Sequence, residues 1–251
     1  WIRNNLKIDK IRIAGNSDLF GSITIPGSKN ASLPILVSTL LSKNDLTLIN
    51  VPHLDDINSM IKLLVNFGVT LSKDINSITL NSSNIKNNIA DYDLVRKMRA
   101  SILVLGPLLA RFKRARISLP GGCAIGTRPI DIHLDSLSML GVKFEIENGF
   151  VTGTVKDKLI GNNINLAFPS VGATENVMMA ATLAKGDTII NNAAKEPEIL
   201  DLQNCLNSMG AKISGSGSKT IKITGVNKLN KSCHSIMSDR IVAGTFILAG
   251  V

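Results

Sequence analysis

Aromatic residues and cysteine are scarce in this sequence. Aromatic residues make up 4% of the 251 residues, which leaves few surfaces on which nucleic-acid bases could stack. The three cysteines contain no C-x-x-C pair and the three histidines show no metal-ligand spacing, so we expect neither a disulfide framework nor a metal site. Cys205 and Cys233 are therefore interpreted as structural.

Long uncharged apolar runs are also missing. The longest one, residues 100–110, is too short to span a bilayer. Basic residues interrupt residues 1–12, and no apolar signal-peptide core follows them. We expect a cytoplasmic protein with no membrane partner.

Positive charge is in excess. The formal net charge of +9 favours anionic partners in general. The dense basic run at residues 113–116 (KRAR) is interpreted as the solvated end of a helix, and no nucleic-acid partner is expected. A hydrophobic content of 44% suits one large or two ordinary domains with a sizeable core.

The two ends of the chain are unusual. The sequence begins at Trp1 and stops at Val251 inside the apolar segment 243–251. Helices and domains seldom end without a cap or a polar tail. We therefore expect the chain to be a piece of a longer protein.

The chain contains three similar units. Gly68, Gly141 and Gly210 are separated by 73 and 69 residues, and each ends an amphipathic helix that leads into a strand. Glycine is the usual residue at that position because it takes the left-handed conformation that closes a helix. The outer helix of the first unit has its apolar stripe within residues 57–64.

A second kind of helix is apolar on nearly every side, which predicts burial. Three such helices are predicted at residues 31–41, 98–110 and 177–184, and residues 241–251 resemble the start of a fourth. Strands are predicted at residues 23–26, 46–49, 70–72, 77–80, 115–119, 143–147, 151–155, 188–190, 212–214 and 220–224. Asn148 and Gly149 favour a type I′ hairpin turn.

These elements predict an α/β fold of repeated βαβαββ-type units, with buried helices and outer sheets. Three units are expected to close into one domain over residues 30–237. Residues 1–29 and 238–251 would then be pieces of a second, truncated domain.

The glycine-rich segment 121–129 (GGCAIGTRP) places Cys123 five residues before Arg128. Glycines allow a backbone to approach a ligand closely, and a nearby cation lowers the pKa of a thiol. The alternative is a turn that holds a small buried cysteine. The segment alone does not decide between them.

Five motifs, taken together and in order, resemble one enzyme family along the whole chain. They are residues 26–31 (PGSKNA), 121–131 (GGCAIGTRPID), 170–176 (SVGATEN), 196–199 (EPEI) and 239–240 (DR). At matching spacing they resemble the UDP-N-acetylglucosamine enolpyruvyl transferases. The resemblance implies an inside-out α/β barrel fold of two three-repeat domains with the active site between them.

The resemblance also implies an activity. The family transfers the enolpyruvyl group of phosphoenolpyruvate to the 3-hydroxyl of UDP-N-acetylglucosamine and releases phosphate, without a cofactor. This is the first committed step of peptidoglycan synthesis, on which cell-wall biogenesis, cell shape and cell division depend, and it is the target of fosfomycin. The related 5-enolpyruvylshikimate-3-phosphate synthases are an alternative, but they have an arginine in the first loop, where this chain has residues 30–34 (NASLP), and no cysteine matching Cys123. An inactive, binding-only fragment is the other alternative.

The resemblance assigns roles to individual residues. Cys123 would protonate the methylene carbon of phosphoenolpyruvate, and its thiolate would also be able to add to that substrate. Lys29, Arg99 and Arg128 would surround the phosphate and carboxylate, although each alone could be a solvated charge. Arg99 is also hard to tell from its basic neighbours in residues 96–99 (RKMR).

Other residues would bind the nucleotide sugar. Asn30 would contact the sugar, or cap the helix that follows it; Asp131 would accept a hydrogen bond from uracil, or cap its own helix. The implied uridine and diphosphate contacts are Pro129, Ile130, Asp131, Ile132, Ser170, Val171 and Gly172.

Some residues depart from the family pattern or are given no catalytic role. Phe168 stands where some members carry a lysine toward the diphosphate, which makes that contact doubtful. His133 and the Glu196–Glu198 segment are interpreted as structural, and Asp239 with Arg240 as support for the cleft. The base that deprotonates the sugar hydroxyl would belong to the missing C-terminal domain, which a complete site needs.

Overall fold

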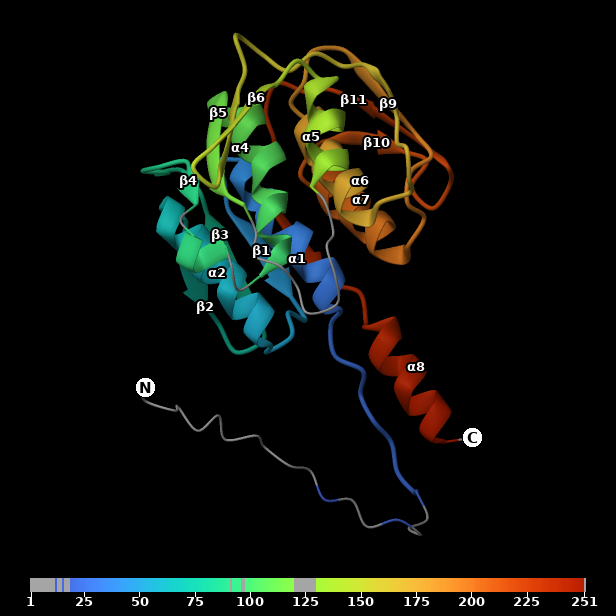
Figure 1. Cartoon of the computed structure of the whole chain (residues 1–251). Helices are drawn as coiled ribbons and strands as arrows, with labels where there is room; N and C mark the ends of the chain where they lie inside the picture. The colour runs from blue at the N-terminus through green and yellow to red at the C-terminus, as the bar shows by residue number, and fades with distance from the viewer. Residues whose placement is uncertain are drawn as a thin grey trace, which may run out of the picture.

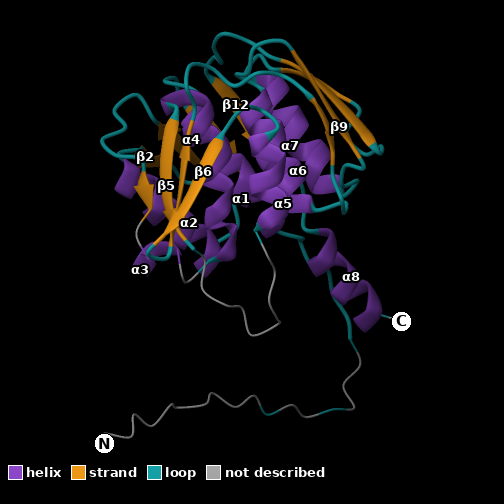
Figure 2. Cartoon of the chain, turned by 45° about the horizontal axis from the view of Figure 1, so that its top comes forward, coloured by secondary structure: helices purple, strands orange, loops and turns teal. Residues whose placement is uncertain are grey.

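The computed structural model describes residues 12, 15, 19–90, 92–95, 98–119 and 130–250. Within these ranges the helices form the interior and three four-stranded sheets lie around them (Figures 1 and 2). This arrangement confirms the predicted α/β fold with buried helices and outer sheets.

The three sheets are built from short strands. The first sheet contains β1 (Leu46–Ile49), β2 (Thr70–Lys73), β3 (Ser77–Asn81) and β12 (Ser232–Ser235). The second contains β4 (Ile89–Ala90), β5 (Arg114–Ser118), β6 (Lys143–Glu147) and β7 (Phe150–Thr154). The third contains β8 (Asn163–Asn165), β9 (Asp187–Asn191), β10 (Lys212–Ser214) and β11 (Thr220–Thr224).

All three sheets have the same pairing. The strand orders are β12-β1-β3-β2, β4-β5-β7-β6 and β8-β9-β11-β10. In each sheet the first pair is parallel and the other two pairs are antiparallel. In the second and third sheets the parallel partner, β4 or β8, comes earlier in the chain than the other strands of its sheet. In the first sheet the parallel partner is β12, which follows the third repeat and pairs with β1 of the first repeat. The last strand therefore joins the third repeat to the first.

Most predicted strands match the observed ones to within one residue at each end. The prediction of a strand at residues 23–26 is wrong, because a strand needs a continuous hydrogen-bonding neighbour and, in the described part of the chain, this segment has none. The sequence prediction also missed β4, β8 and β12. These strands are only two to four residues long, so they are too short for the apolar alternation that marks a strand.

The inner helices are buried on all sides. They are α1 (Lys29–Ser38) with its short extension η1 (Thr39–Leu41), η2 (Arg99–Val104) with α4 (Leu105–Phe112), and α6 (Val171–Ala181). All residues of α6 from Ala173 onward are buried. This helix begins six residues before the predicted start at residue 177, because Ser170 caps it and its first turn is only partly apolar.

The outer helices are amphipathic. They are α2 (Asp55–Phe67), α5 (Asp131–Ser138) and α7 (Pro197–Ser208). Gly68, Gly141 and Gly210 follow them with φ values of 111°, 96° and 101°, which confirms the predicted left-handed closures. The hairpin between β6 and β7 turns at Asn148 and Gly149, both with positive φ as a type I′ turn requires.

The basic run at residues 113–116 differs from its prediction. Lys113 does close α4, with a φ of 64°, but the following residues belong to β5. Within that strand Ala115 is buried, and the guanidinium of Arg116 lies 4.4 Å from the centre of the Phe150 ring. The run is therefore mostly a strand, and only its first residue is a helix end.

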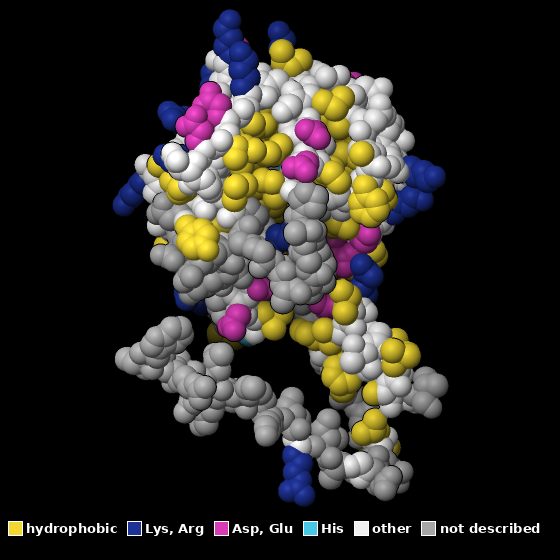
Figure 3. All heavy atoms as spheres, viewed as in Figure 1, with side chains coloured by type: hydrophobic (Ala, Val, Ile, Leu, Met, Phe, Trp, Pro, Cys, Tyr) yellow, Lys and Arg dark blue, Asp and Glu magenta, His cyan; other side chains and the backbone are white. Residues whose placement is uncertain are grey.

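Two segments extend together from one side of the body (Figures 1 and 2). Residues 19–27 enter α1, and α8 (Arg240–Ala249) leaves β12 after a short link. Backbone hydrogen bonds connect the two segments where they leave the body. The Ser28 amide donates to the Met237 carbonyl, and the Asp239 amide donates to the Pro26 carbonyl. No residue of α8 is buried, and its apolar side chains are visible in Figure 3.

Among the helices of the described ranges, none is both long and apolar enough to cross a membrane.

Candidate anion-binding active site

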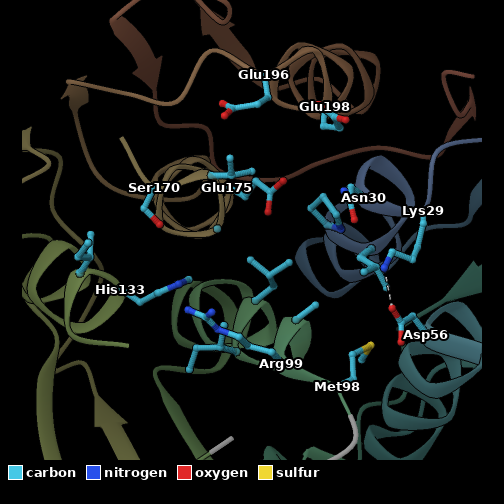
Figure 4. A pocket seen from close by; sticks show the side chains of 18 of the residues that line it. Lys29, Asn30, Asp56, Met98, Arg99, His133, Ser170, Glu175, Glu196 and Glu198 are labelled. Atoms are coloured by element: carbon cyan, nitrogen blue, oxygen red, sulfur yellow. Dashed lines mark hydrogen bonds and ion pairs between the residues drawn. The ribbon is translucent and has the colours of Figure 1, made fainter. Parts of the chain in front are cut away.

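A cavity of about 890 Å³ opens where several inner and outer helices begin (Figure 4). Its walls come from the first turns of α1, α2, α5, α6 and α7, from η2, and from the first residue of α8. Helix N-termini present unpaired backbone N–H groups and a partial positive charge. Several helix N-termini, each of which attracts anions weakly, therefore surround one cavity.

Seven of the predicted site residues line this cavity. They are Lys29, Asn30, Arg99, Ile132, Ser170, Val171 and Gly172. Ile130 and Asp131 are described but do not line it, while Cys123, Arg128 and Pro129 lie outside the described residues.

Lys29 lies at the first position of α1. Its ammonium Nζ is 3.0 Å from Asp56 Oδ2 at the start of α2, and its backbone amide donates to Asp239 Oδ2 at 3.3 Å. Both side chains of the ion pair are about 40% exposed. Such a pair is worth up to about 1 kcal/mol, so an anionic ligand would displace Asp56 at small cost.

Two predicted helix caps are wrong. Ser28, not Asn30, caps α1, and its side chain accepts a hydrogen bond from the Ala31 amide. Asn30 lies one position inside the helix, and its exposed side chain faces the cavity (Figure 4). Ile130 occupies the cap position of α5, so Asp131 is the exposed first residue of that helix.

The first turn of α6 forms one wall. Ser170 caps the helix through its Oγ, which accepts from the Ala173 amide at 3.3 Å. Val171 and Gly172 therefore lie inside the helix and not before it, which corrects the sequence interpretation. Amides at these first positions have no partner within a helix, so they are available to an anion.

Two buried carboxyl groups also line the cavity, Glu198 from α7 and Glu175 from α6. Glu198, at the start of α7, is buried and accepts a hydrogen bond at 3.0 Å from Nε of Arg240 on α8. Glu175 is also buried, and no hydrogen bond or ion pair to it occurs within the described ranges. Burial, followed by the charges of Glu198 and Glu196, raises the pKa of Glu175 well above its usual range. Burial and the two neighbouring carboxylates therefore favour the protonated form of Glu175.

His133 lies on the cavity wall, where the sequence prediction gave it only a structural role. The residue is 4% exposed, and its Nδ1 is 3.2 Å from Nδ2 of Asn176. Burial, followed by the positive charge of Arg99, lowers the pKa of His133 to about 4. The imidazole is therefore neutral at neutral pH.

Sequence reasoning also missed Asp56 and Glu175 as cavity residues, whereas Arg240, which was expected to support the cleft, does line the cavity. A signal was present for Asp56, because an acidic residue in the first turn of a predicted helix lies at its positive end. Glu175 lies in the motif at residues 170–176 that carries the family resemblance, but no role was assigned to it there. Phe168, at the predicted departure from the family pattern, also lines the cavity and is 62% exposed.

The arrangement suits a ligand that carries both phosphate and hydroxyl groups. Lys29, Arg99 and Arg240 supply positive charge, and the α6 amides supply neutral donors. Carboxyl and amide side chains supply hydrogen-bond acceptors for hydroxyl groups. Among the residues that the structure describes, no group of His, Cys, Asp or Glu is arranged to hold a metal ion.

The fold is an α/β fold of buried helices and outer sheets, and its cavity at the helix N-termini suits an anionic ligand. Residues 13–251 match the model of the EPSP synthase (3-phosphoshikimate 1-carboxyvinyltransferase) family. The chain belongs to this family.

Curated relatives carry a more specific name. The chain is 53% identical over 243 residues to UDP-N-acetylglucosamine 1-carboxyvinyltransferase of Coxiella burnetii (strain Dugway 5J108-111), covering 96% of this chain and 56% of the relative. It is 49% identical over 251 residues to the protein of the same name in Paramagnetospirillum magneticum (strain ATCC 700264 / AMB-1), covering 96% and 58%. The chain thus spans little more than half the length of these relatives.

Solved structures confirm the fold. The enolpyruvyl transferase NikO from Streptomyces tendae superposes with a TM-score of 0.82 at 21% identity, covering 94% of this chain and 56% of that one. EPSP synthase from Acinetobacter baumannii superposes with a TM-score of 0.72 at 19% identity, covering 91% and 52%. The inside-out α/β fold predicted from the resemblance is therefore confirmed.

Proposed function

We propose that this chain forms one side of an active site that transfers enolpyruvyl from phosphoenolpyruvate to the 3-hydroxyl of UDP-N-acetylglucosamine, releasing phosphate. The reaction would commit the sugar to peptidoglycan and so serve cell-wall formation. Both substrates carry phosphate and do not cross membranes unaided, so we place the reaction in the cytoplasm.

One observation carries this proposal. The cavity brings together seven residues, from parts of the chain far apart in sequence, that the family resemblance had marked for these two substrates. The name of the curated relatives, UDP-N-acetylglucosamine 1-carboxyvinyltransferase, supports the nucleotide sugar as the acceptor and carboxyvinyl as the transferred group. The first loop also lacks the arginine of the shikimate enzymes, which disfavours the shikimate alternative despite the name of the family model.

We assign the chemistry as follows. Lys29 and Arg99, with Arg128, would hold the phosphate and carboxylate of phosphoenolpyruvate, because several cations must converge on so small and charged a substrate. Cys123 would deliver a proton to the methylene carbon, which leaves an oxocarbenium-like centre for the sugar hydroxyl to attack. Asn30 would contact the sugar, and the α6 amides the diphosphate. Residues 129–132 would line the uridine site.

We further propose that residues 30–237 form a complete three-repeat domain. The pairing of β12 with β1, which joins the third repeat to the first, supports this boundary. The exposed apolar side chains of α8 and of residues 19–23 would then pack within a second domain. That domain would supply the base that deprotonates the sugar hydroxyl, so the 251-residue chain alone should not turn over.

Selective alkylation tests the role of Cys123. In the full-length enzyme, fosfomycin should label Cys123 and spare the other two thiols. Cys205 is an internal control, since burial raises the pKa of its thiol to about 12; exposed Cys233 controls for simple accessibility. Cys123→Ser should lose about 10²–10⁴-fold in kcat while remaining folded. Labelling of Cys233 as fast as Cys123, or full turnover by the serine variant, would contradict the assignment.

A further inference from the structure

The orientation of the Asn176 side chain is fixed by two groups of known polarity. The Gly106 amide can only donate, and it lies 2.7 Å from Asn176 Oδ1. The Ile102 carbonyl can only accept, and it lies 3.0 Å from Asn176 Nδ2. The amide oxygen and nitrogen of Asn176 are therefore assigned without ambiguity.

This orientation determines where the proton of His133 lies. Asn176 Nδ2 has two hydrogens, one for Ile102 and one directed at His133 Nδ1, 3.2 Å away. Nδ1 must then accept, so in the neutral ring the proton is on Nε2. The ring is neutral because burial and Arg99 oppose its protonation.

The Nε2–H group has no partner of its own within the described ranges, although the residue is 4% exposed. A Cβ added to Gly172 would lie 3.3 Å from Nε2 and 3.1 Å from Cε1, so this ring edge lies against the first turn of α6. Figure 4 shows the His133 ring pointing into the cavity toward Arg99. A neutral donor, a cation and the α6 amides thus meet at one wall.

We propose that His133 is a binding residue for the diphosphate of the nucleotide sugar, donating its Nε2–H to a phosphate oxygen held at the first turn of α6. The inference rests on the function proposed above and adds a residue that its motifs did not include. A neutral donor suits this position because a second full charge beside Arg99 would be repelled. Glycine at position 172 lets the ring lie close to the helix, since an added Cβ would require the ring to shift by a few tenths of an ångström.

Two variants separate the donor from the fold. His133→Asn places an amide oxygen near the position of Nδ1, so it keeps the contact with Asn176 and loses the distal donor. His133→Gln can place an amide N–H near the position of Nε2. Thermal unfolding of both variants checks that the fold is retained.

The first readout needs no substrate. In ¹⁵N-labelled 251-residue chain at pH 7, the His133 ring nitrogens should show the neutral Nε2–H tautomer, and UDP should shift the Nε2–H resonance. A neutral Nδ1–H tautomer or a charged ring would overturn the proposal.

The second readout is substrate affinity. In the full-length enzyme, His133→Asn should raise KM for UDP-N-acetylglucosamine about 10-fold to 100-fold, the effect of a hydrogen bond to a charged group, while KM for phosphoenolpyruvate stays unchanged. His133→Gln should recover most of the loss. Unchanged KM for the sugar in His133→Asn would overturn this inference alone, whereas a wild-type enzyme indifferent to UDP-N-acetylglucosamine would overturn the proposed function itself.

Discussion

At the scale of single residues, the cavity holds ionisable groups whose charge is set by burial. His133 is the clearest example, because its folded-state pKa of about 4 lies below the ordinary value of 6.5. Between these values the unfolded chain binds a proton that the folded chain does not. Stability should therefore fall as the pH falls from 6.5 to 4.

The size of this effect follows from the shift. A difference of about 2.5 pKa units corresponds to about 3 kcal/mol in the free energy of unfolding. Urea unfolding at pH 7 and pH 4 measures it, with His133→Asn as the control that cannot titrate. The wild type should lose about 3 kcal/mol more than the variant over this range. An equal loss in both proteins would show that His133 is not buried in its neutral form.

Glu175 should act in the opposite direction. Its pKa is raised above the ordinary value of 4.5, so the folded chain keeps a proton that the unfolded chain releases. The wild type should lose stability as the pH rises above 4.5 and through the raised pKa. Glu175→Gln keeps the shape and stays neutral, so its unfolding free energy in urea should fall less between pH 5 and pH 8.5. A steeper fall in the variant would contradict the assignment.

Site residues differed in how well the sequence could predict them. Lys29 and Ser170 lie in motifs that the family resemblance marks for substrate binding, and both line the cavity. Glu175 and His133 could not be recognised in this way, because their chemistry depends on burial and on contacts with distant helices. The Asn176 contact to Gly106, which fixes the His133 tautomer, joins residues 70 positions apart.

At the scale of elements, close packing of inner helices holds the cavity wall in place. Gly106 on α4 lies against α6, where an added Cβ would come within 2.4 Å of Asn176 Oδ1 and 2.5 Å of the Asn176 carbonyl oxygen. The clash involves backbone, so the helices would have to separate.

Gly106→Ala should therefore lower the free energy of unfolding by about 1–3 kcal/mol, the usual cost of overpacking. Gly244→Ala on α8 is the matched control, since nothing lies within 4 Å of its added Cβ and alanine favours a helix. Urea unfolding of both variants measures the difference. A Gly106→Ala protein as stable as the control would show that α4 and α6 do not approach so closely.

Element prediction succeeded where local patterns decide the structure. The hairpin strands and glycine-closed helices follow from alternation, turn residues and caps, all of which are local. β8 and β12 could not be predicted, because their polar residues become strands only through parallel pairing with a neighbouring repeat. Residues 23–26 show the converse, since an extended apolar pattern without a paired neighbour forms no strand.

At the scale of the whole molecule, three sheets around buried helices place the helix N-termini of all three repeats at one end. α1, α6 and α7 each contribute charged or amide groups to the same cavity. Arg240 and Asp239, at the start of α8, connect that cavity to the segment we assign to a second domain. The substrate contacts and the domain contacts that we propose therefore share the same few residues.

The most direct test of this account is phosphate release from phosphoenolpyruvate by the full-length enzyme. Release should require UDP-N-acetylglucosamine, and shikimate 3-phosphate should not replace it, because the first loop lacks the arginine of the shikimate enzymes. Turnover with shikimate 3-phosphate and none with UDP-N-acetylglucosamine would contradict the proposed function.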